Sequence, residues 1–473
     1  MTASRRWRRW RLGIYWADDL RLEHLLRLRW PARSVAFHPS LPLLAVGTGD
    51  YDGGYCFDGE LLLVDLESGW TRSMLDAERD VRLVEWLDDR TLRLLVAPRS
   101  EDTEGAHDHG YEFVLERDWG GAGEHTISLN TGDKPLVEAP VRRSAEAELL
   151  ELSPGWTRRR QVWDVARVGD GRVLAVLERV ALEAWSVSGE REWAVPDEAG
   201  GRQIAVAPDE RSAMVNISER TRLVEGRWTR PSGHALRVSL ADGNVLETFD
   251  IGASMVFTTR EDGWLALRDV RYKEERPQTR LVSPEGIEAG RVALGRCVGG
   301  HHVLRVRKSP ELHFIQGRNS ASPRDDTWVV SVGVPDGEVR RLFPLEWEAG
   351  VDRLIFGGPA VRVDGALVHG GGLAARRGRM ADSEYIVRRR LPDGAVDWLL
   401  RGDFTVTALE ADGDTVYAAL QAGEIVALNA ADGTVRWRTE IPGTPLSMSL
   451  DRDGRMLIGT AEGRILDCDV TAH

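Results

Sequence analysis

A short turn of small or polar residues ending in glycine recurs along the chain, and it constrains the fold more than any other feature. The turns are Glu67-Ser68-Gly69, Asn130-Thr131-Gly132, Val187-Ser188-Gly189, Ala241-Asp242-Gly243, Pro284-Glu285-Gly286, Pro335-Asp336-Gly337, Pro392-Asp393-Gly394 and Ala431-Asp432-Gly433. Glycine suits the last position because that position usually needs a positive φ angle, which is costly for other residues. The chain therefore repeats a unit of about 50 residues.

Apolar and polar residues alternate on both sides of these turns, as they do in short antiparallel strands. The hairpin at Glu424–Gly443 shows the alternation most regularly. Two further strands precede each turn, such as Val406–Glu410 and Thr415–Leu420 before Glu424–Asn429. Four short strands per period predict an all-β chain with the architecture of a β-propeller.

The turns also predict how the ring is organised. Counting Ala17-Asp18-Asp19 as a ninth turn gives nine four-stranded blades, with eight or seven as alternatives. The last unit has only three strands, so we expect a strand at about residues 20–30 to complete it and close the ring, since closure removes an open sheet edge. This predicts a basic Arg/Trp tail at 1–12 and a single propeller at 13–473, with blades at about 33–470. The sixth unit lacks a clear first strand around Gly295–Arg307.

Two stretches resemble known repeat families. The string ALNAADGTVRW at Ala427–Trp437, together with WLLRG after PDGAV, resembles the repeats of quinoprotein-like (PQQ-like) propellers. The string RSVAFHPSLPLLAVGTG at Arg33–Gly49 resembles the first two strands of WD40-like blades. The resemblance holds at superfamily level and implies a propeller fold. Quinoprotein dehydrogenases have adjacent cysteines beside the quinone and are exported, whereas no two cysteines are adjacent here, so we expect no cofactor.

Composition restricts the class of protein and its location. The net charge of −13 argues against a whole-molecule affinity for nucleic acid or an anionic membrane. Cys56, Cys297 and Cys468 are too few and too scattered for a disulfide framework. The charged start of the chain does not match a secretory signal. We therefore expect a cytoplasmic protein, and the strong preference for arginine over lysine is typical of bacterial coding.

The connections between second and third strands are long in several units. They are Gly49–Gly59, Arg99–Gly123, Ser218–Gly233, Asp269–Thr279, Lys308–Asp326 and Gly370–Ser383. In a propeller such connections share one face, and long loops on a rigid scaffold often carry function. The first two are acidic and the others basic. The predicted partner-binding residues are Arg222, Arg227, Arg230, Lys273, Arg276, Arg318, Arg324, Arg376, Arg377 and Arg379.

Candidate chemistry in these loops is sparse. His107 and His109 are two imidazoles at i and i+2, and they need a further ligand from elsewhere to hold a transition metal. Asp50 and Asp52 have the spacing of a calcium loop without its final glutamate. Simple loop-forming residues explain both sets as well, so we predict no metal site and no catalytic residue.

The sequence therefore predicts a non-catalytic scaffold or recognition subunit that binds a protein partner through the long loops of one face. A hydrolase or lyase with its site at the mouth of the central channel is one alternative, and converging buried carboxylates or histidines would favour it. A nucleic-acid adaptor that uses the basic loops is the other alternative.

Overall fold

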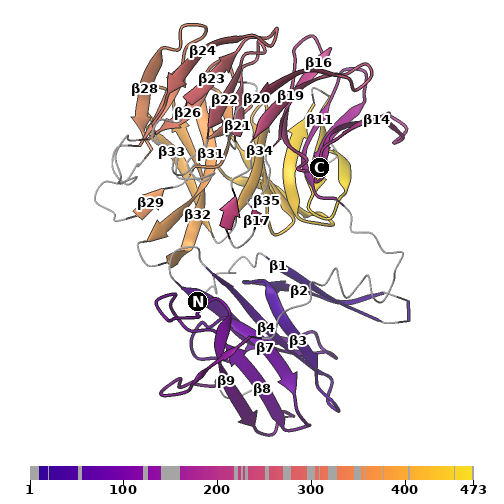
Figure 1. Ribbon diagram of the computed structural model, residues 1–473, viewed down its shortest axis with the longest axis vertical. Helices are drawn as coiled ribbons and strands as arrows, with labels where there is room; N and C mark the ends of the chain where they lie inside the picture. The colour runs from indigo at the N-terminus through magenta and orange to yellow at the C-terminus, as the bar shows by residue number, and fades with distance from the viewer. Residues whose placement is uncertain are drawn as a thin grey trace. The chain divides into compact units, whose positions relative to one another are not determined.

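The computed structural model describes most of the chain as β-strands and turns (Figure 1). The described residues are 10–16, 18–19, 21–51, 56–120, 126–139, 160–217, 222–224, 227–229, 233–250, 255–269, 278–295, 304–307, 309–317, 327–345, 353–355, 357–375, 378–402, 405–451 and 453–470. Throughout these residues the structure contains strands and no helix, so the all-β prediction is confirmed.

The chain divides into two compact units. The first comprises Met1–Thr157 and Ala374–Ala381, and the second comprises Arg158–Leu373 and Asp382–His473. The predicted single ring of nine blades from residue 13 to residue 473 is therefore not confirmed. Each predicted repeat nevertheless forms a sheet of its own.

The described N-terminal residues of the first unit form three antiparallel sheets. One contains β1 (Trp10–Tyr15) and β2 (Leu22–Leu28). The next contains β3 (Ala32–Phe37), β4 (Leu43–Tyr51), β5 (Phe57–Asp65) and β6 (Thr71–Ser73). The third contains β7 (Val81–Trp86), β8 (Thr91–Val96), β9 (His109–Glu116) and β10 (Leu136–Glu138).

The β3–β6 sheet is buried on both faces, which explains the nearly continuous apolar runs in β4 and β5. Leu44 and Leu62 pack with Leu26 and Leu28 of β2, whereas Leu61 belongs to the core shared with β7–β10. The prediction that the N-terminal strand closes the ring is not confirmed, because β2 hydrogen-bonds to β1 and packs on the β3–β6 sheet.

In its described residues the second unit contains seven larger sheets that follow one another along the chain, besides one small two-stranded sheet. The first sheet is β11–β14 (Val162–Arg167, Val173–Leu177, Val180–Trp185, Arg191–Pro196). The second is β15, β16, β19 and β20 (Gly201–Val206, Ser212–Ile217, His234–Ser239, Val245–Asp250). The third is β21–β24 (Met255–Thr259, Leu265–Asp269, Gln278–Val282, Glu288–Ala293). The fourth is β26–β28 (Leu312–Gln316, Trp328–Val332, Val339–Pro344), and the fifth is β30–β33 (Pro359–Val363, Ala366–Ala375, Gly378–Arg390, Val396–Gly402), which β25 (Arg305–Val306) and β29 (Arg353–Ile355) join. The last two are β34–β37 (Val406–Asp412, Thr415–Leu420, Glu424–Asn429, Val435–Glu440) and β38–β40 (Pro445–Leu450, Arg455–Thr460, Ile465–Asp469).

Each of these sheets contacts the next one, and β38 and β39 of the last sheet contact β11 of the first. Leu457 of the last sheet is buried with Val162 and Val165 of the first. The edge between them is therefore covered by side-chain packing, and the last sheet keeps three strands in the described residues.

Three of the predicted long loops contain strands of the main sheets instead. The stretch Arg99–Gly123 includes β9, and Lys308–Asp326 includes β26. The stretch Gly370–Ser383 is mostly the two arms of the β31–β32 hairpin. Another connection, Ser218–Gly233, carries an additional two-stranded sheet of β17 (Arg222–Val224) and β18 (Arg227–Thr229).

The irregular sixth repeat is confirmed. Its sheet has three strands in the described part, and β25, which stands where a first strand was expected, pairs in parallel with β30 of the following sheet. This displacement decides where the side chains of β25 lie.

Candidate functional site

Two arginines at β25 form a charged cluster inside the second unit. Leu304 and Val306 are fully buried in an apolar core, so Arg305 and Arg307 belong to the opposite face of the strand. Arg307 Nη2 donates to Asp164 Oδ1 of β11 over 2.6 Å. Its Nη1 donates to the Met448 carbonyl of β38 over 3.4 Å, so residues from three separate sheets meet here.

Arg305 extends from the same face of β25 to the sixth sheet. Its Nη2 donates to the Thr407 carbonyl of β34 over 3.5 Å. Thus the first strands of the first, sixth and seventh sheets all contact these two guanidinium groups. We call Asp164, Arg305, Arg307 and the nearby Glu410 of β34 the axial cluster.

The two arginines of the axial cluster differ in how far nearby carboxylates compensate their positive charges. Burial lowers the pKa of Arg307, but attraction to Asp164 and Glu410 outweighs it and leaves that pKa raised. The pKa of Arg305 is lowered, first by desolvation and then by repulsion from Arg307. Arg307 is therefore part of an ion pair, whereas Arg305 lies in a desolvated position without an equal compensating charge.

Asp164 is fully used in holding the sheets together. Its side chain is 1% exposed, and its Oδ2 accepts a hydrogen bond from the Ile204 backbone N–H of the next sheet over 2.9 Å. Its Oδ1 accepts from the backbone N–H of Val165 as well as from Arg307. Both carboxylate oxygens of Asp164 therefore accept hydrogen bonds from within the protein, which indicates a structural role.

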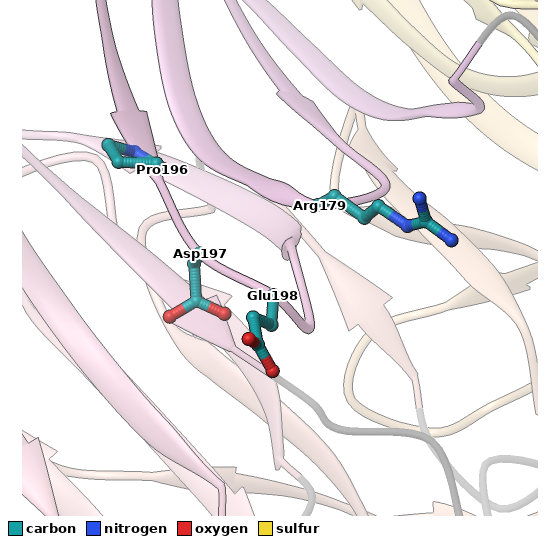
Figure 2. Close-up of a pocket in the computed structure, with 4 residues that line it drawn as sticks. All are labelled: Arg179, Pro196, Asp197 and Glu198. Atoms are coloured by element: carbon teal, nitrogen blue, oxygen red, sulfur yellow. The ribbon is translucent and has the colours of Figure 1, made fainter. Parts of the chain in front are cut away.

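A separate pocket of about 550 Å³ lies at the end of the first sheet of the second unit, lined by Arg179, Pro196, Asp197 and Glu198. Figure 2 shows the Arg179 guanidinium pointing away from the two carboxylates. Asp197 Oδ1 accepts the Ala199 N–H over 2.8 Å, and its Oδ2 lies 3.4 Å from His234 Nε2. The pocket is acidic, and its lining contains no serine, threonine, cysteine or lysine.

Ser309, His313 and Glu311 lie in the order of a hydrolytic triad. The Ser309 Oγ to His313 Nδ1 distance is 3.4 Å, and His313 Nε2 lies 3.4 Å from Glu311 Oε2. Ser309 and His313 are both completely buried, so no substrate reaches the hydroxyl. Glu311 also pairs with Arg340 and Arg362, which indicates a structural ion-pair group.

Most of the predicted basic residues fall outside the described residues. These are Arg230, Lys273, Arg276, Arg318, Arg324, Arg376 and Arg377. For Arg222, Arg227 and Arg379 the structure describes the backbone, in β17, β18 and β32. The pairing of Arg222 with Thr229 and of Val224 with Arg227 puts both arginine positions on one face of the small sheet.

The metal candidates do not converge. His107 packs edge-on against Tyr51 and Phe57, and His109 Nδ1 lies 2.9 Å from Asp108 Oδ1. Asp50 lies 3.7 Å from Arg33, and Asp52 lies outside the described residues. Across the described part of the chain, no group of three His, Cys, Asp or Glu side chains could hold a metal ion.

The sequence predictions missed the axial cluster. The signal for it was the alternation Leu304-Arg305-Val306-Arg307, in which two apolar and two charged residues mark opposite faces of a strand. No sequence pattern showed that this strand leaves its own sheet.

The comparisons with known proteins agree with the sheet pattern. A sequence profile of the family described as outer membrane protein assembly factor BamB, a PQQ-like repeat family, matches residues 347–470. The chain therefore resembles the PQQ-like repeat proteins over this stretch, which confirms that part of the predicted resemblance. The match covers the most regular of the predicted repeats.

Two solved structures are partly similar to the chain. A structure of U3-55K has a TM-score of 0.45 and 11% identity, over 65% of this chain and 90% of that chain. The WD40 β-propeller domain of Doa1 has a TM-score of 0.45 and 13% identity, over 66% of this chain and 93% of that chain. No curated protein sequence matches the chain. None of the described segments forms an apolar helix that could cross a membrane.

Proposed function

We propose that residues 158–473 form a closed seven-bladed propeller that acts as a non-catalytic scaffold or recognition subunit for a protein partner. The unbroken series of sheet contacts, in which the last sheet meets the first, supports closure and the number seven. In this arrangement the two sheets β3–β6 and β7–β10 belong to a separate unit.

The observation that supports the binding role is that the connections between second and third strands are long or carry additional strands. The second-to-third-strand connections contain the β17–β18 sheet and the long β31–β32 arms, whereas third and fourth strands are joined by tight turns such as Ser186–Glu190. In a propeller these elaborated connections share a face. Their arginines favour a partner that presents acidic side chains. The matching family is also described as an assembly factor, which is consistent with this role.

A hydrolase or lyase at the channel mouth has less support. The one carboxylate of the axial cluster with known hydrogen-bond partners, Asp164, is occupied by three N–H donors, and arginines make up half of the cluster. A nucleic-acid adaptor would use the same basic loops, but the net charge of −13 opposes it. We propose a cytoplasmic location on the sequence grounds given above.

The proposal is tested by capturing partners from the native cells with the tagged full-length chain. Arg222→Glu combined with Arg227→Glu reverses two charges on one face of the β17–β18 sheet, and we expect about tenfold weaker capture. Arg211→Glu is the matched control, because Arg211 is an exposed arginine in the turn between β15 and β16, a connection of the other type.

Equal capture by the wild type and the double variant would exclude these positions from the binding face. Capture of nucleic acid with a steep dependence on salt, and of no protein, would support the adaptor instead. The corresponding reversals at Arg376, Arg377 and Arg379 test the β31–β32 hairpin in the same way.

A further inference from the structure

We propose that Arg305 forms an anion-binding site inside the second unit, where its guanidinium group takes a small oxyanion, a carboxylate or a phosphate. The site is distinct from the long connections, so it does not depend on the partner proposed above. It is also distinct from the acidic pocket at Asp197 and Glu198.

The position of β25 is the first support. The strand lies beside β30 of the fifth sheet, and its arginines contact β11, β34 and β38. β30, β11, β34 and β38 are each the first strand of their sheet. In a propeller the first strand of each sheet is the innermost one. The guanidinium groups therefore lie where the sheets converge around the axis of the second unit.

The second support is the unequal pairing of two neighbouring arginines. Arg307 forms a 2.6 Å ion pair with the carboxylate of Asp164, which is buried and also accepts a backbone hydrogen bond. Among the described residues, Arg305 has one hydrogen bond, to the Thr407 carbonyl at the long distance of 3.5 Å, and no carboxylate partner. A guanidinium group carries five N–H donors in a planar fork, and most donors of Arg305 have no acceptor in the described part of the chain.

The third support is that the Arg305 side chain is accessible although it is desolvated. Arg305 is exposed, and the protein around it nevertheless lowers the pKa of its guanidinium group, mainly by desolvation. A cation that is reachable by solvent but poorly hydrated binds an anion more strongly than a cation on an open surface, because screening is weaker there.

Guanidinium geometry determines the class of ligand. Two parallel N–H groups match two oxygen atoms of a carboxylate or a phosphate, and such charge-assisted pairs are short and directional. Chloride lacks this two-oxygen geometry. We therefore expect saturable binding of oxyanions that an equal ionic strength of sodium chloride does not reproduce.

The test measures the melting temperature of the full-length protein during titration with inorganic phosphate and, separately, with succinate. We expect at least one of them to raise the melting temperature in a saturable way. Arg305→Met should weaken that binding about tenfold or more, since charge-assisted hydrogen bonds are among the stronger ones. Arg305→Lys keeps the charge but loses the planar fork, and it should bind with intermediate affinity.

The behaviour of Arg305→Met without any anion separates a binding role from a structural one. Removing a poorly compensated charge should leave the melting temperature unchanged or raise it. Arg464→Met is the matched control, because Arg464 is an exposed arginine of the same unit near the β39–β40 turn. Its anion binding should equal that of the wild type.

Three results would overturn the proposal. They are the absence of saturable binding of both anions to the wild type, undiminished binding to Arg305→Met, and a marked fall in the melting temperature of Arg305→Met without anion. The last result would show that Arg305 stabilises the fold. Partner capture by Arg305→Met should remain intact, so failure here leaves the scaffold proposal standing.

Discussion

The Arg167 guanidinium of β11 lies 2.7 Å from the Asp467 carboxylate of β40, and this ion pair joins the first and last sheets of the second unit. The same guanidinium lies 3.0 Å from Asp451, in the turn after β38. Beside these charges, Leu457 and Val162 are almost completely buried. The junction of the two ends of the unit is therefore made of side chains, and no strand is shared across it in the described residues.

Gly459 sets how closely the two sheets approach at this junction. A Cβ atom there would lie 2.8 Å from Val162 Cγ1 and 2.7 Å from Ser447 Oγ. Gly459→Ala should therefore destabilise the second unit by about 1–3 kcal/mol through overpacking. Chemical denaturation measures this. Gly290→Ala is the control, because its nearest neighbour would be 3.7 Å away, and an equal loss in both variants would argue against the tight approach.

Deleting residues 1–30 should affect the first unit alone. The deletion removes Leu26 and Leu28 and exposes the apolar face of the β3–β6 sheet. We expect faster amide hydrogen exchange in β4 and β5, with β11 and β38–β40 unchanged. Faster exchange in β38–β40 instead would revive the prediction that the N-terminal strand closes the ring.

Arg389 is a buried arginine that ties the fifth sheet to the end of the fourth. It is 3% exposed and donates to the carbonyl groups of Pro344, Leu345 and Gly394 over 2.8–3.0 Å. Arg389→Lys cannot make all these bonds and should cost about 2–4 kcal/mol of stability. Arg390→Lys, at an exposed neighbour that pairs with Asp397, should cost far less by thermal unfolding.

His369 should make the protein sensitive to acid. It is completely buried, and desolvation lowers its pKa from 6.5 to about 3. The unfolded chain binds a proton between these values while the folded chain does not, so stability falls as pH drops below 6.5. The loss from neutral pH to pH 5 is about 2 kcal/mol.

His369→Leu should therefore reduce the slope of stability against pH in that range, as measured by urea unfolding at several pH values. His109→Asn is the contrast, because the hydrogen bond with Asp108 raises the pKa of this partly exposed histidine. An unchanged slope in His369→Leu would mean that another group controls the acid response.

Local patterns in the sequence predicted the strands closely. The third repeat was expected at Val162–Val168, Arg172–Leu177 and Val180–Val187, and its strands are Val162–Arg167, Val173–Leu177 and Val180–Trp185. The turn at Val187-Ser188-Gly189 has the expected positive φ of 82° at Gly189. Such features depend on neighbours a few residues apart, so periodicity and turn residues suffice to predict them.

The candidate site could not be predicted in this way. The partners of Arg305 and Arg307 lie more than 100 residues away in the sequence, and β25 reaches them because it leaves its own sheet for β30. The apolar residues of β2 would be buried equally well in a strand that closes the ring and in a strand that packs on the face of the β3–β6 sheet. Alternation specifies that one face of a strand is buried, and it does not specify the surface that buries it.

The sequence by itself determined the strands, the turns and the repeat, because these follow from local backbone preferences and from the period of apolar residues. Only the tertiary structure decided that the repeats separate into two units, that Leu457 rather than an N-terminal strand covers Val162, and that Arg305 lies beside Arg307 and Thr407. Those outcomes depend on which apolar and charged surfaces fit each other over long sequence distances.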